Sequence, residues 1–68
     1  MLTNRNYYEL HSPIHMDALT GALYVVARAK RRNAKPCIAQ WVITTDGKPY
    51  VLCLRDEYIP HRIKLILT

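Results

Sequence analysis

The stretch from Cys37 to Arg55, CIAQWVITTDGKPYVLCLR, decides the fold that this sequence predicts. Its first half is rich in β-branched and aromatic residues that alternate with a period of two, as residues in strands do. The Asp46-Gly47 dipeptide follows, and this pair is a strong signal for a tight hairpin turn. The alternation resumes after the turn. The sequence therefore predicts a β-hairpin with strands at about 37–45 and about 49–55.

A two-residue loop at Asp46-Gly47 would fix which residues of the two strands lie opposite each other. All six residues on one face are then apolar or aromatic, so this face is expected to contact the core. A slip of one residue would invert the two faces. The predicted pairs are Ile43 with Tyr50, Trp41 with Leu52, and Ala39 with Leu54.

The segment before the hairpin carries apolar residues at helical intervals. Their spacing is typical of one face of an amphipathic helix. Ser12-Pro13 is a favourable helix start, Asn33 is a favourable end, and Pro36 prevents continuation. We expect a helix over about 13–33, packed on the face of the sheet that carries Trp41. The residues with helical spacing are Met16, Leu19, Leu23 and Val26.

The two ends of the chain complete the predicted domain. Residues 62–67 alternate in polarity and predict a third antiparallel strand, placed beside the second, beside the first or against another molecule. Residues 1–11 have no clean period but are apolar enough to lie on the domain as an irregular arm. The expected fold class is α+β: one domain over 1–68, with a single helix packed on a three-stranded meander.

Size and charge limit the range of functions. The 68 residues suffice for one small domain, and the formal net charge of +5 favours anionic partners. The longest apolar run, from Ala18 to Ala27, is half the length that a membrane span needs, so no membrane partner is expected. The chain has two cysteines, far fewer than a disulfide scaffold of this size, which favours a cytoplasmic location.

The sequence contains no catalytic set, and we expect neither an enzyme nor a cofactor. A domain this small should have no room for a substrate pocket of ordinary size. His11 and His15 have the spacing of metal ligands on a helix, but Pro13 places His11 outside the predicted helix, so no metal site is expected. The predicted register places Cys37 and Cys53 on opposite faces of the hairpin.

Half of the chain's ten Lys and Arg residues lie between Val25 and Cys37. This basic segment has two interpretations. It is either the solvated end of a helix, where cations meet the helix dipole, or a phosphate-binding surface. The second interpretation predicts a small regulatory protein that binds DNA or RNA, with tyrosines that could stack on unpaired bases. Its predicted binding residues are Arg28, Arg31, Arg32, Lys35, Tyr24, Arg55, Arg62 and Lys64.

A protein-binding adaptor or inhibitor is the alternative function. The outer face of the predicted sheet is apolar where water would favour polar residues, and the C-terminal strand would leave an open edge. Either surface could bind an acidic protein or form a homodimer. Small regulatory proteins of phages and other mobile elements have this general character. The predicted interface residues are Ile38, Val42, Val51 and Ile66.

Overall fold

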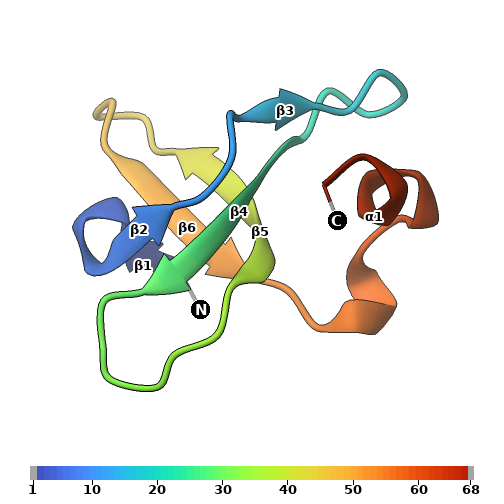
Figure 1. The fold of residues 1–68 in the computed structure, drawn as a ribbon. Coiled ribbons are helices and arrows are strands. Elements are labelled where there is room, and N and C mark those ends of the chain that lie inside the picture. Colours follow the sequence, from blue (N-terminus) through green and yellow to red (C-terminus); the bar gives the residue numbers. More distant parts are fainter. Residues whose placement is uncertain (1, 68) are drawn as a thin grey trace.

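Strands, not a helix, dominate the computed structural model, which describes residues 2–67. Within that range six antiparallel strands form one curled sheet in the order β1-β6-β5-β4-β2, with β3 also paired to β4 (Figure 1). One helix, α1 (His61–Leu67), lies to one side of the sheet. The predicted helix on a three-stranded meander is therefore wrong. The strands are β1 (Leu2–Asn4), β2 (Tyr8–Leu10), β3 (His15–Met16), β4 (Leu23–Ala29), β5 (Cys37–Ile43) and β6 (Pro49–Cys53).

The segment predicted as a helix over 13–33 forms β3, a turn and β4 instead. The apolar residues of β4 form a continuous run, and periodicity alone does not distinguish such a run from a buried helix. β4 pairs with β5 on one side and with β2 and β3 on the other, so it lies inside the sheet. Gly21 (φ 75°) completes the turn before β4 in the left-handed conformation, where its N–H donates to Asp17 O at 2.8 Å.

Ser12 caps a strand and not a helix. Its Oγ accepts a hydrogen bond from the N–H of Val26 at 2.9 Å and donates to the carbonyl of Pro13 at 2.9 Å. These bonds lie between β2 and β3, where the pairing with β4 is interrupted. The side chain thus satisfies a backbone N–H of β4 that the interrupted ladder would leave without a partner.

The hairpin of β5 and β6 is present, but its predicted register is wrong by one residue. The N–H of Thr44 donates to Lys48 O at 3.0 Å, and the N–H of Gly47 donates to Thr44 O at 2.8 Å. The loop therefore has three residues, with Gly47 at φ 81°, which matches a turn followed by a left-handed residue. Trp41 consequently lies opposite Val51.

The C-terminal segment predicted as a strand over 62–67 forms α1. The N–H groups of Ile63 and Lys64 both donate to the carbonyl of Pro60, at 2.9 and 3.2 Å, and so begin the helix. Ile63 is fully buried and Leu67, four residues later, is partly buried, whereas Leu65 is 69% exposed. The buried positions therefore follow the spacing of a helix and not the alternation of a strand.

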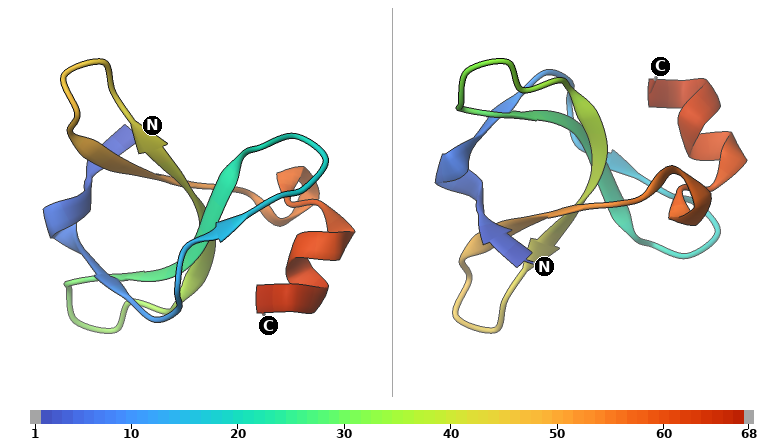
Figure 2. Two further views of the ribbon diagram at one scale, coloured as in Figure 1. Left: turned by 90° about the horizontal axis from the view of Figure 1, so that it is seen from above. Right: turned by 90° about the horizontal axis from the view of Figure 1, so that it is seen from below.

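The N-terminal arm is more regular than predicted. β1 pairs with β6 at one edge of the sheet, and β2 pairs with β4 at the other. The short 3-10 turn η1 (Arg5–Tyr7) joins the two strands. Because the sheet curls, this segment crosses from one edge to the other, as seen from above and below in Figure 2.

Apolar residues are buried on both faces of the central strands. The inner face of the curl holds Ala27, Ala39 and Val51, all with 0% exposure. On the outer face, Tyr24 and Ile38 pack against Ile63 of α1. Burial on both faces explains why β4 reads as a continuous apolar run and not as an alternating one.

An ion pair fastens α1 to the turn before β4. The buried carboxylate of Asp17 accepts two hydrogen bonds from Arg62, at 2.8 Å from Nε and 2.7 Å from a terminal nitrogen. Thr20 Oγ1 donates to the same carboxylate at 2.7 Å. The bonds from Arg62, followed by those from Thr20, hold the pKa of Asp17 well below its ordinary value.

This ion pair predicts a specific acid sensitivity. Because the folded-state pKa of Asp17 is lowered, its contribution to stability is present above about pH 4 and is lost as pH falls further. Asp17→Asn should therefore lower Tm at neutral pH and flatten the dependence of Tm on pH below about 4. Thermal melts from pH 7 to 2 measure both effects. Asp56→Asn removes an exposed partner of Lys64 and is the control, expected to retain the wild-type profile.

Candidate nucleic-acid interface

Four of the chain's ten Lys and Arg residues lie in the loop between β4 and β5, which we call the basic loop (residues 30–36). It projects from one end of the sheet, on the side away from α1 (Figure 1). The loop contains no acidic residue, and among the described residues its cations form no ion pair. The exposed cations are Lys30, Arg31, Arg32 and Lys35.

Backbone contacts hold the basic loop in place. Arg28, at the end of β4, donates from Nε to the carbonyl of Ala34 at 2.9 Å. The N–H of Ala34 in turn donates to Arg31 O at 3.3 Å. Asn33 adopts φ 65°, a left-handed conformation that Asn tolerates well. Asn33, predicted to end a helix, therefore uses its tolerance of this conformation in a hairpin loop instead.

An exposed tyrosine lies beside the basic loop. The N–H of Lys30 donates to Tyr7 O at 3.0 Å, which extends the ladder of β2 and β4 by one position. Tyr7 is the last residue of η1, so this bond places its backbone opposite Lys30. Tyr7 is 67% exposed. An exposed aromatic residue is thus joined through the backbone to the first residue of the basic loop.

Glu9 is an acidic residue close to the base of this surface. It lies opposite Arg28 in the ladder, and its carboxylate contacts His11 Nε2 at 2.7 Å. The bond with His11, supported by the charges of Arg28 and Lys30, lowers the pKa of Glu9 below its ordinary value. Glu9 therefore stays charged at neutral pH and balances part of the positive charge at the base of the loop.

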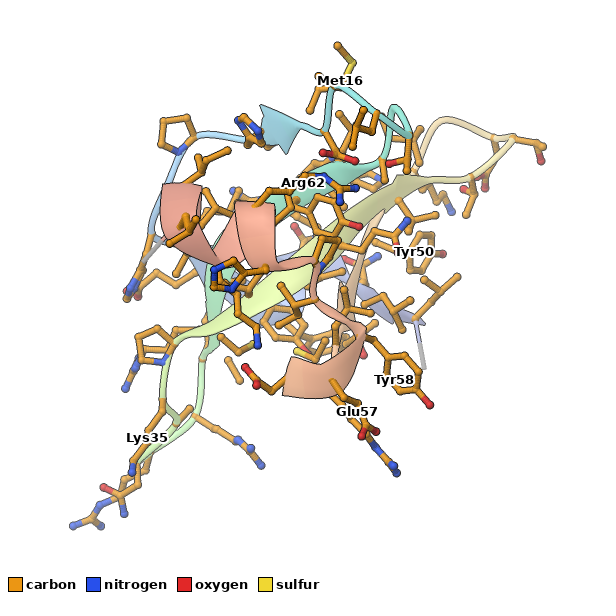
Figure 3. All side chains as sticks on the ribbon, turned by 90° about the vertical axis from the view of Figure 1, so that its right-hand side faces the viewer. Met16, Lys35, Tyr50, Glu57, Tyr58 and Arg62 are labelled. Atoms are coloured by element: carbon orange, nitrogen blue, oxygen red, sulfur yellow. The ribbon has the colours of Figure 1, made fainter. Side chains whose placement is uncertain are left out.

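The remaining predicted nucleic-acid residues lie elsewhere. Tyr24 is 7% exposed beneath α1 and cannot stack on a base there. Arg62 is bound to Asp17, and Lys64 contacts Asp56 at 2.7 Å. Figure 3 shows Arg62 and Lys35 far apart in the molecule. Arg55 is exposed but stands after β6, outside the basic loop.

The predicted protein-interface residues do not share one surface. Val51 is fully buried inside the curl, and Ile38 is covered by α1 on the opposite face. Val42 is half-buried on β5, and Ile66 is 55% exposed on α1. Near Ile66 there is a surface cavity of about 280 Å³, lined by Ser12, Pro13, Ile14, His15, Ile66 and Leu67.

Neither a metal-binding cluster nor a membrane-spanning helix is found in the described part of the chain. Over residues 2–67 no group of three or more His, Cys, Asp or Glu side chains is placed to hold a metal ion. In the same range no helix has the length and apolar character needed to cross a membrane.

Sequence reasoning found the cations of this surface but not their arrangement. The neighbours Tyr7 and Lys30 are far apart in the chain, and only the pairing of β2 with β4 brings them together. Comparisons with known proteins add no assignment: no family model matches the chain, and neither the curated proteins nor the solved structures contain a significant match.

Proposed function

We propose that this chain is a non-enzymatic nucleic-acid-binding protein that holds phosphates with the basic loop. The observation that carries the proposal is a projecting loop with four exposed cations and no acidic residue. Such a cluster attracts polyanions and releases their counterions on binding. Three of the four cations, Arg31, Arg32 and Lys35, belong to the set that the sequence predicts. The fourth, Lys30, joins them in the loop.

Single strands are the form that this surface favours. Tyr7 is an exposed aromatic residue whose backbone is bonded to that of Lys30, and bases of a single strand can stack on such a ring while their phosphates contact nearby cations. Bases inside a duplex are already stacked and do not offer their faces. In addition, α1 lies on the side of the sheet away from the basic loop, so it is not placed to enter a major groove together with the loop (Figure 1).

Replacing Tyr7 tests the stacking contact. Each stacked base contributes about 1–3 kcal/mol, so Tyr7→Leu should weaken binding of a short single-stranded oligonucleotide about fivefold or more. Fluorescence anisotropy at low salt measures the affinity. Binding to duplex of the same length, which depends on phosphate contacts, should change by less than about twofold.

Tyr58 provides a matched control. It is also 67% exposed, but it stands beside Glu57 and away from Lys35 (Figure 3). Tyr58→Leu should therefore leave the affinity for single strands unchanged. Equal losses in the two variants, or no loss in either, would show that Tyr7 is not a stacking platform. The absence of salt-sensitive binding to any nucleic acid would overturn the proposed function itself.

A further inference from the structure

The two cysteines lie side by side on the inner face of the sheet, contrary to their predicted placement on opposite faces. Cys37 begins β5 and Cys53 ends the neighbouring strand β6, where it lies opposite Ala39. The two sulfur atoms are 3.3 Å apart. Because a disulfide has a length of about 2.05 Å, a movement of little more than 1 Å would bring the sulfurs to bonding distance.

The two thiols differ in their surroundings. Cys53 is exposed, whereas Cys37 is partly buried. Burial, followed by the contact with Cys53, raises the pKa of Cys37 to about 11. Since the thiolate is the reactive form, Cys37 is a poor target for an oxidant in solution. Cys53 also contacts the hydroxyl of Tyr8 at 3.3 Å, so a polar group adjoins its sulfur.

We propose that Cys37 and Cys53 form a reversible intramolecular disulfide when the protein meets a peroxide. The Cys53 thiolate attacks one oxygen of hydrogen peroxide, the O–O bond breaks, and hydroxide leaves to give a sulfenic acid. The hydroxide takes up the proton that Cys53 lost. The neighbouring Cys37 then attacks the Cys53 sulfur, the S–S bond forms, and the S–O bond breaks as the Cys37 thiol proton passes to the departing hydroxide, which leaves as water. Two thiols are thereby oxidised and one peroxide is reduced to two waters.

The disulfide would join the two strands of the β5–β6 hairpin at their open end. Cys37 is also the first residue after the basic loop, so the bond would tie the base of that loop to β6. A bond that closes the segment from Cys37 to Cys53 restricts the unfolded chain and so stabilises the folded protein. The oxidised protein should therefore melt about 10 °C higher than the reduced protein.

Peroxide treatment of the reduced, full-length chain tests the proposal. Intact mass spectrometry should show a loss of about 2 Da in a monomer, and thiol labelling should fall from two groups to none. Dithiothreitol should restore both thiols. These readouts are independent of whether the chain binds nucleic acid, so their result does not depend on the proposed function.

Two single variants test the order of reaction. In Cys37→Ser the remaining Cys53 should give a sulfenic acid that a dimedone probe traps, because its partner is absent. In Cys53→Ser the remaining Cys37 should react at least tenfold more slowly. Circular dichroism establishes that each variant is folded, and the wild-type mass shift stands as evidence if one is not. Disulfide-linked dimers, or Cys53 oxidised to sulfinic acid while Cys37 stays free, would overturn the proposal.

Discussion

Replacing the four exposed cations of the basic loop with alanine should remove most of the salt-sensitive binding to single-stranded nucleic acid. Each phosphate contact to a single strand contributes about 0.7 to the slope of log K against log salt. Four contacts therefore give a slope of nearly 3. Wild-type affinity should then fall about fiftyfold between roughly 50 and 200 mM salt, while the variant should be almost insensitive over that range. The substitutions are Lys30→Ala, Arg31→Ala, Arg32→Ala and Lys35→Ala.

Two double variants distinguish the effect of where the cations are from the effect of how many there are. Arg31→Ala with Arg32→Ala removes two cations from the basic loop. Lys48→Ala with Arg55→Ala removes two exposed cations from other parts of the surface. If the loop is the binding site, only the first pair should lower the salt slope, by about 1.4. Equal effects of the two pairs would indicate that net charge alone attracts the nucleic acid, and that no site exists at the loop.

Ile63→Ala should have the largest effect on stability. Ile63 is fully buried between α1 and the outer face of the sheet, where it contacts Tyr24 and Ile38. Truncation of a buried isoleucine to alanine costs about 2–5 kcal/mol, because it removes apolar contacts and leaves a cavity. For a domain of this length the whole free energy of unfolding is only about 3–10 kcal/mol. Thermal melts should show Tm falling by at least about 10 °C.

Leu65→Ala is the matched control on the same helix. Leu65 is 69% exposed, so its truncation should change the free energy of unfolding by less than about 0.5 kcal/mol. The two substituted residues are two positions apart in α1, and they differ mainly in the side of the helix on which they lie. Were residues 62–67 a strand, Ile63 and Leu65 would share one face, and the two substitutions would have similar effects. The difference in Tm between them therefore tests the correction from strand to helix.

Local chemistry predicted the β5–β6 hairpin and the break in the chain before it. The β5–β6 hairpin follows from β-branched residues on both sides of Asp46-Gly47, and its strands lie within about two residues of their predicted bounds. Asn33 and Pro36 likewise mark an interruption that the structure contains, since β4 ends before them and β5 begins after them. The register was beyond this reasoning, because two- and three-residue loops both accommodate Asp-Gly and only the pairing with other strands selects one.

The placement of the candidate surface depended on tertiary structure. The sequence predicts basic residues between Val25 and Cys37, but their position in a projecting loop requires that β4 be a strand. Tyr24 and Arg62 show the same limit, since the first is buried beneath α1 and the second is bound to Asp17. The partner of each residue lies far away in the chain, and no local pattern records such a contact.

The sequence alone indicated a hairpin, a basic segment and an apolar run too short to cross a membrane. Tertiary structure decided whether two ambiguous segments, residues 23–29 and 61–67, form a strand or a helix. Each has an apolar pattern that both a strand and a helix can bury. Residues 23–29 form a strand because strands pair with them on both sides. Residues 61–67 form a helix that covers the outer face of β4 and β5. Burial against a partner, and not local preference, selected the conformation because the apolar surface must be covered.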